Sequence, residues 1–143
     1  MYKILSSQYA PDIGASSVHI MTDLGEFSGL AKLHPEDRNY ESSYTGCHIA
    51  ELRARRKYWI ALRKQYRAVK KELVETRTAI ESLRTAEDHY KVINLITKRI
   101  EKIDKAIDEL TDYINDTHRV AGMIDAMHRE TVDKINQNKD KNN

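Results

Sequence analysis

The side chains best suited to chemistry in this sequence are the basic ones of residues 51–84. This segment holds eleven Lys and Arg against four Glu, and nine of those bases lie between Glu51 and Glu72 with no acid among them. Rows of cations bind the phosphates of nucleic acid or the carboxylates of an acidic protein. The candidate contacts for such a partner are Arg53, Arg56, Lys57, Arg63, Lys64, Arg67, Lys70, Lys71, Arg77 and Arg84.

Catalytic and metal-binding patterns are weak by comparison. His34 and Asp37 could hydrogen-bond to each other, but the His-Pro-Glu-Asp run that contains them is typical of a structural turn after a strand. His34, Asp37, Cys47 and His48 lack the C-x-x-C or H-x-x-x-H spacing of a metal site. The sequence also has no glycine-rich phosphate loop and no nucleophile elbow. We therefore predict a protein that is not an enzyme and that uses no cofactor or metal.

The composition indicates a soluble chain. Hydrophobic residues make up 40% of the 143 residues and charged residues 32%, and no uncharged apolar run approaches the ~20 residues that span a bilayer. The first eight residues lack the apolar core of a signal peptide. A single cysteine, Cys47, excludes an internal disulfide framework and fits a reducing compartment. We expect a cytoplasmic protein with no membrane partner.

The elements that must position the bases are two helices, each marked by an apolar seam. Residues at alternating spacings of three and four run from Trp59 to Leu83, and a second such series runs from Ile93 to Ile114. The residues expected to pack along these seams are Trp59, Leu62, Tyr66, Leu73, Ile93, Ile96, Ile100, Ile103, Ile107 and Leu110. The two series are out of phase by one residue, which a break between 84 and 90 resolves. This favours an antiparallel hairpin with coiled-coil packing, and the alternative is one helix of ~70 residues in a parallel dimer.

The bases follow the same heptad. Position e of the first helix, beside the seam, holds a base in five successive heptads, namely Arg56, Arg63, Lys70, Arg77 and Arg84. In an antiparallel pair these bases face position e of the second helix. That position holds Thr97, Asp104, Thr111 and His118, which include one acid. We therefore predict that most of this positive charge is left for a partner.

The N-terminal residues predict a small β hairpin. Residues 18–22 and 27–33 alternate in polarity like strands, and Gly25 between them can take the positive φ that a hairpin turn often needs. Residues 2–5 predict a short further strand, and residues 6–17 a loop. Because a lone hairpin is marginally stable in water, its apolar face must pack on the first helix.

The expected fold class is mainly α, of the α+β type. Residues 1–46 form the β head and residues 47–135 the helical hairpin. After Ile114 we expect either a short third helix or a kinked continuation, with its apolar face turned around Gly122. Residues 136–143 are polar and are expected to be a disordered tail.

One set of short motifs resembles a known module. The residues that carry it are Gly29-Leu30-Ala31, His34-Pro35-Glu36-Asp37, Gly46, Ile49-Ala50 and Arg53-Ala54. Together they look like a hairpin–helix module of uncharacterised phage, prophage and bacterial proteins, one family of which is described as similar to the double-stranded-RNA-binding fold. The resemblance covers residues 18–54. It implies a phage-type origin, a place in the host cell and a small α+β head, and it brings no known activity.

These observations lead to two hypotheses of different classes. The first is a non-enzymatic, phage-type protein that binds nucleic acid, or an acidic partner in a nucleic-acid-handling complex, through its basic helix face; an inhibitor of host defence would fit the phage resemblance. The alternative is a structural assembly protein, such as a virion scaffold or adaptor, that self-associates through its coiled coil. Both hypotheses include a homo-oligomer, with a dimer as the simplest case.

Overall fold

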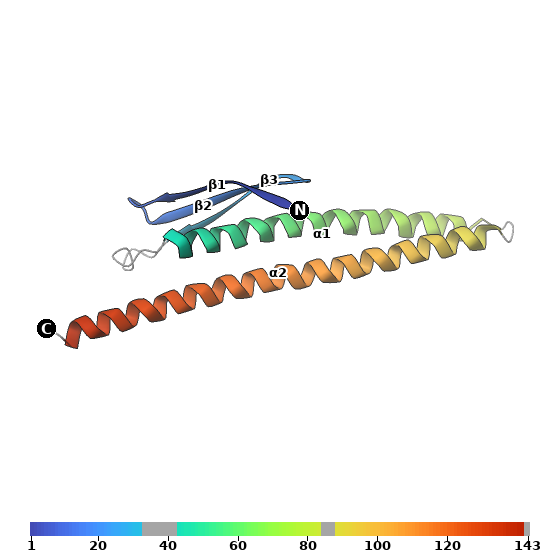
Figure 1. Ribbon diagram of the computed structural model, residues 1–143. Helices are drawn as coiled ribbons and strands as arrows, with labels where there is room; N and C mark the ends of the chain where they lie inside the picture. Colours follow the sequence, from blue (N-terminus) through green and yellow to red (C-terminus); the bar gives the residue numbers. More distant parts are fainter. Residues whose placement is uncertain (33–42, 84–87, 142–143) are drawn as a thin grey trace. The chain divides into compact units, whose positions relative to one another are not determined.

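The protein combines a small sheet with two long helices. The computed structural model describes residues 1–32, 43–83 and 88–141. Strands β1 (Tyr2–Ala10), β2 (Ala15–Thr22) and β3 (Gly25–Lys32) come first, and helices α1 (Ser43–Glu81) and α2 (Asp88–Lys141) follow (Figure 1). The α+β class predicted from the sequence is confirmed. The predicted break is also observed, because α1 ends at Glu81 and α2 begins at Asp88, and the alternative of one uninterrupted helix is wrong.

The sheet is larger than the predicted hairpin. Its three strands are antiparallel in the order β1-β2-β3, and Ile20 in the central strand lies opposite Ile4 on one side and Phe27 on the other. The loop predicted for residues 6–17 is confirmed only at residues 11–14, which form a turn; the rest is wrong, because β1 extends to Ala10 and β2 begins at Ala15. Ser7 and Gln8 are exposed in the edge strand β1, where no apolar side chain is required, whereas Ser16 is buried on the same face of β2 as Val18 and Ile20. Gly25, the first residue of β3, has a φ of 110° where the turn from β2 ends, as its position predicted.

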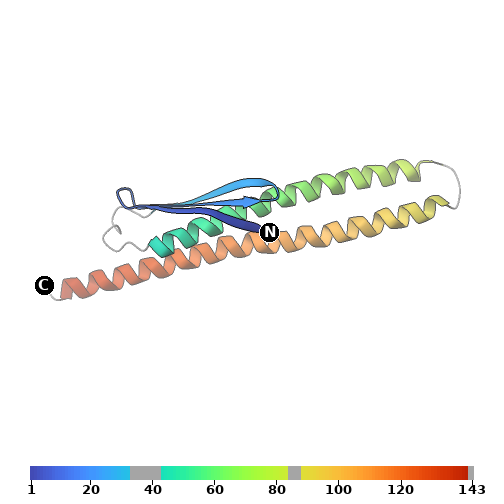
Figure 2. The ribbon, with the colours of Figure 1, turned by 45° about the horizontal axis from the view of Figure 1, so that its top comes forward.

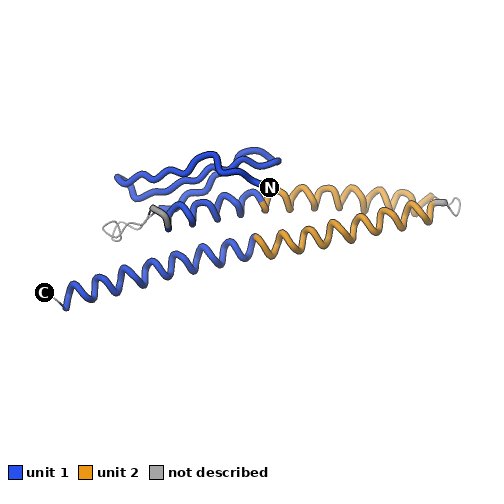
Figure 3. Tube along the Cα trace, in the orientation of Figure 1, with its two compact units in different colours: residues 1–58, 114–143 blue, residues 59–113 orange. Residues whose placement is uncertain are grey.

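The chain divides into two compact units, and each is described by itself. Unit 1 contains residues 1–58 and 114–143, and unit 2 contains residues 59–113 (Figure 3). Both helices therefore contribute one segment to each unit.

In unit 1 the sheet packs on the first part of α1 (Figure 2). Val18 and Ile20 are almost fully buried on the inner face of β2, and Ala50 and Ala54 are fully buried on α1. The strand and helix backbones meet at Gly29, where a Cβ atom would overlap the carbonyl oxygen of Ala50. Small residues at these positions are what allows the sheet to approach the helix so closely.

The last part of α2 completes unit 1 on the other side of α1 (Figures 1 and 2). Its buried and half-buried residues continue the seam spacing beyond Ile114, through Thr117, Ala121, Ile124, His128 and Val132. The predicted third helix is wrong, because α2 runs through Gly122 without interruption. A glycine inside a helix costs only about 1 kcal/mol, and the burial on both sides of it offsets that cost. The helix also continues through residues 136–141, where a disordered tail was expected.

Unit 2 is an antiparallel pair of helix segments. Ile100 and Leu110 are buried. The other residues expected to pack along the seams are half-buried, namely Trp59, Leu62, Tyr66, Leu73, Ile93, Ile96, Ile103 and Ile107. Within α1 the burial departs from the heptad at Val69, which is 46% exposed, while Val74 is half-buried. Leu83 is 58% exposed and lies beyond the end of the helix. A straight helix of 3.6 residues per turn drifts about 20° per heptad, which moves the seam across its surface. The coiled-coil packing stays a prediction.

Neither helix has, within residues 43–83 and 88–141, an apolar stretch that could cross a bilayer.

Candidate polyanion-binding surface

Three of the predicted position-e bases contact the second helix within unit 2. Arg63 Nη1 donates to Thr111 Oγ1 at 3.2 Å, and Arg77 Nη1 donates to Thr97 Oγ1 at 3.4 Å. Lys70 Nζ lies 2.5 Å from Asp104 Oδ1. The opposition of the two e positions predicted from the sequence is confirmed at these three pairs. The two arginines bond to neutral hydroxyls and keep their charge, whereas the charge of Lys70 is offset by a carboxylate.

Three further bases of unit 2 point away from the helix pair. We call Lys64, Arg67 and Lys71 the outer basic row; all three are exposed, and none forms an ion pair with any residue that the structure describes. Their spacing of three and four places them on one side of α1 over about 10 Å of helix. This row is the part of the predicted basic surface that is open to a partner.

The bases nearest the sheet form hydrogen bonds with it. Arg53 Nη1 donates to the carbonyl oxygen of Leu30 at 2.6 Å, and Lys57 Nζ donates to that of Ser28 at 2.8 Å. Both acceptors lie on β3, which is an edge strand. These side chains thus cover backbone groups that an edge strand leaves unpaired, a role that the sequence reasoning missed. Of the two remaining candidates, Arg56 is half-buried in unit 1 and Arg84 lies outside the described residues.

A second basic cluster lies on α2 and was also missed. Lys98, Arg99, Lys102 and Lys105 line a shallow hollow of unit 2 together with Leu95 and Glu101. No surplus of bases marks this cluster in the sequence, because acids slightly outnumber bases along α2. The helical spacing of 98, 102 and 105 was the signal that could have revealed it.

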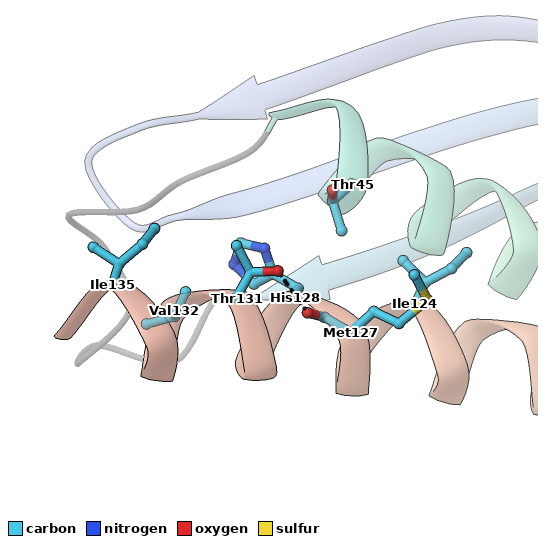
Figure 4. Close-up of a pocket in the computed structure, with 7 residues that line it drawn as sticks. All are labelled: Thr45, Ile124, Met127, His128, Thr131, Val132 and Ile135. Atoms are coloured by element: carbon cyan, nitrogen blue, oxygen red, sulfur yellow. Dashed lines mark hydrogen bonds between the residues drawn. The ribbon is translucent and has the colours of Figure 1, made fainter. Parts of the chain in front are cut away.

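Unit 1 has an apolar groove between its two helix segments. Its lining is Thr45 from α1 and Ile124, Met127, His128, Thr131, Val132 and Ile135 from α2, and its volume is about 440 Å³ (Figure 4). Met127 is 64% exposed, so an apolar side chain is open to water there. The Thr131 hydroxyl donates to the carbonyl oxygen of Met127. Among the seven lining residues, His128 is the only one with an ionisable side chain.

Tyr2 of β1 contacts two polar residues of α1. Glu51 accepts a hydrogen bond from the Tyr2 hydroxyl at 2.9 Å, and burial, followed by this bond, raises the pKa of Tyr2. The Arg55 guanidinium stacks 5.1 Å from the centre of the Tyr2 ring.

Cys47 and His48 line a small hollow next to Glu51. Among residues 1–32, 43–83 and 88–141, no three His, Cys, Asp or Glu side chains gather as a metal site would require. His34 and Asp37 lie outside the described residues.

In comparisons with known proteins, no family model, no curated protein and no solved structure matches this chain.

Proposed function

We propose that the protein is a non-enzymatic binding protein that engages a polyanion, in the first place nucleic acid, through the outer basic row of Lys64, Arg67 and Lys71. The observation that carries this proposal is that these three cations are exposed and form no ion pair within the described residues. Lys70, one residue from Lys71, does pair with Asp104 and is left out of the proposed contact.

Electrostatics supports a phosphate backbone as the partner. Each cation that meets a phosphate releases a condensed counterion, which is a favourable and sequence-independent contribution to binding. Arg63 and Arg77 add to the field around the row, because their own partners are uncharged hydroxyls. Aromatic stacking on single-stranded bases is not part of the proposal, since Trp59 is half-buried and its ring stacks on Tyr113 at 5.4 Å between ring centres.

The test is a neutralising triple variant, Lys64→Gln, Arg67→Gln and Lys71→Gln. Its matched control is Lys98→Gln, Lys102→Gln and Lys105→Gln, which removes the same charge from α2 of the same unit. Binding of labelled duplex and single-stranded oligonucleotides is measured by fluorescence anisotropy at low and moderate salt. We expect the outer-row variant, which loses the proposed phosphate contacts, to bind at least tenfold more weakly. We expect the control to change Kd by less than about threefold, because it keeps those contacts.

Two results would contradict the proposal. Equal losses in both variants would mean that binding follows net charge alone. Unchanged binding of the outer-row variant would remove this surface from the interaction.

Assembly is the second candidate function, and one observation favours it. Glu101 and Asp108 are exposed and lie one turn to either side of Asp104, on the stripe of α2 that contacts α1 through Lys70. Unit 2 therefore carries a basic row on one helix and acidic residues on the other, which is complementary to a second copy of itself. Light scattering over a range of concentrations tests this candidate. A rise in mass that the outer-row variant and 1 M salt both abolish supports assembly, whereas a concentration-independent monomer rules it out.

A further inference from the structure

We infer that unit 1 contains a phosphate-binding site in a cavity between α1 and α2. The cavity has a volume of about 180 Å³ and is lined by Leu52, Arg53 and Arg56 of α1 and by Thr117, His118, Ala121, Gly122 and Asp125 of α2. This site is separate from the outer basic row, all of whose residues belong to unit 2.

The strongest support for a phosphate site comes from the buried donor of Arg56. Its side chain is half-buried, and its Nε atom is buried without a hydrogen-bond partner among the described residues. The guanidinium group is always charged, and its buried Nε–H is an unsatisfied donor, which is unfavourable. An oxyanion in the cavity would balance the charge of this group.

Two neighbouring groups add donors to the same cavity. Arg53 uses Nη1 on the carbonyl oxygen of Leu30, and the rest of its planar group carries further N–H donors. The His118 imidazole can donate one N–H when neutral and two when protonated. The Thr117 hydroxyl is not counted as a donor, because it already donates to the carbonyl oxygen of Ile114 at 2.8 Å.

The one acid in the lining does not cancel this charge. Asp125 lies at the cavity, but Arg129 Nε approaches its Oδ2 within 3.5 Å and offsets it. Arg53 and Arg56 thus leave the cavity positive even when His118 is neutral. The small volume of the cavity limits the ligand to one compact anion.

The shape of the cavity fits a phosphate group. Its volume corresponds to about six water molecules at ~30 Å³ each, enough for a tetrahedral oxyanion. Leu52 is 6% exposed and forms an apolar wall that excludes water from one side. On the opposite helix, a Cβ atom added at Gly122 would meet nothing within 4 Å. A side chain at position 122 therefore has open space to enter, which gives a means of blocking the site.

The experiment uses the full chain and titrates it with inorganic phosphate by isothermal calorimetry, with chloride at equal ionic strength as the blank. The variants are Arg56→Gln, which removes the charge, and Gly122→Glu, which places a carboxylate at the cavity. Gly122→Ala is the matched control for the backbone change, and thermal melting verifies that each variant is folded. We expect wild type and Gly122→Ala to bind alike and the other two variants to bind at least tenfold more weakly.

A second arm identifies the source of the phosphate. A tetranucleotide with a 5′-phosphate is compared with the same tetranucleotide ending in a 5′-hydroxyl. Tighter binding of the phosphorylated form than of inorganic phosphate assigns the site to a nucleotide-borne phosphate, and binding of inorganic phosphate alone assigns it to the free anion.

The outcomes separate this site from the outer basic row. The Lys64→Gln, Arg67→Gln and Lys71→Gln variant should bind phosphate like wild type, whatever it does to long nucleic acids. The inference is overturned if wild type shows no saturable binding of either phosphate source. It is also overturned if folded Gly122→Glu and Arg56→Gln proteins bind as wild type does.

Discussion

The hydroxyl of Tyr58 donates a hydrogen bond to Oδ1 of Asp23 at 2.6 Å and so ties α1 to the turn between β2 and β3. Tyr58 is 3% exposed, and its ring lies 5.9 Å from that of Phe27. The bond lowers the pKa of Asp23 below its ordinary value of 3.8. A carboxyl group whose pKa falls on folding stabilises the protein above the ordinary pKa, and that contribution is lost as the pH falls through the folded value.

The first prediction follows from the lowered pKa of Asp23. Tyr58→Phe keeps the ring against Phe27 but removes the bond, so it should lower the unfolding midpoint at pH 7. It should also lose less stability than wild type between about pH 5 and pH 3, because the pKa of Asp23 returns toward its ordinary value. Thermal melts of both proteins at the two pH values test this. An equal loss in both proteins would mean that the bond makes no contribution to the pH dependence.

The second prediction compares two glycines. Gly29→Ala places a Cβ atom against the backbone of Ala50, so it should destabilise the protein by about 1–3 kcal/mol, since neither backbone can yield easily. Gly122→Ala meets nothing within 4 Å and lies inside α2, so it should stabilise by about 0.5–1 kcal/mol. Denaturant unfolding measures both. If Gly29→Ala is neutral, the close approach of β3 to α1 is wrong.

The third prediction separates the heptad pattern from actual burial. Leu110 and Val69 both lie on predicted seams, but Leu110 is 7% exposed and Val69 is 46% exposed. Leu110→Ala should therefore cost about 2–4 kcal/mol, and Val69→Ala about 0.5 kcal/mol or less. Similar losses for the two, measured by urea unfolding, would show that α1 keeps its predicted seam and does not drift.

The fourth prediction concerns the helix–helix ion pair. Both side chains of Lys70 and Asp104 are more than a third exposed, so the pair is well screened by solvent. Lys70→Gln should change stability by about 0.5 kcal/mol or less. A loss above about 1.5 kcal/mol in chemical unfolding would mean that the pair is shielded from water, as buried charge pairs are.

The fifth prediction is a salt dependence for the proposed nucleic-acid contact. If three cations meet phosphates, the logarithm of the binding constant for duplex should fall against the logarithm of the salt concentration with a slope of about −3. The Lys64→Gln, Arg67→Gln and Lys71→Gln variant should show a slope near zero. A steep slope that persists in the variant would place the phosphate contacts elsewhere.

Much of the fold was predictable because it depends on local periodicity. The series from Trp59 and from Ile93 predicted two helices and the break between them, and the opposition of Arg63 to Thr111 followed from their equivalent heptad positions. The turn at Gly25 was predictable for the same reason, since its positive φ is a local requirement. In each case the residues within one or two turns contain the necessary information.

The strands and helix ends that were predicted wrongly depend on partners distant in sequence. Residues 6–10 form a strand because β2 pairs with them, and nothing in Ser6-Ser7-Gln8 itself favours a strand. Gly122 stays helical because α2 buries residues on both sides of it in unit 1, and burial outweighs the local preference.

The candidate site residues were likewise predictable only where local sequence decides their properties. Composition alone determined that α1 is rich in cations, because charge is a property of each side chain and not of its neighbours. Only the tertiary structure decided that Arg53 and Lys57 cover β3, that Lys70 is neutralised by Asp104 and that Arg56 is half-buried beside a cavity. Those outcomes depend on where residues 20 or more positions apart meet, which burial and packing establish once the chain has folded.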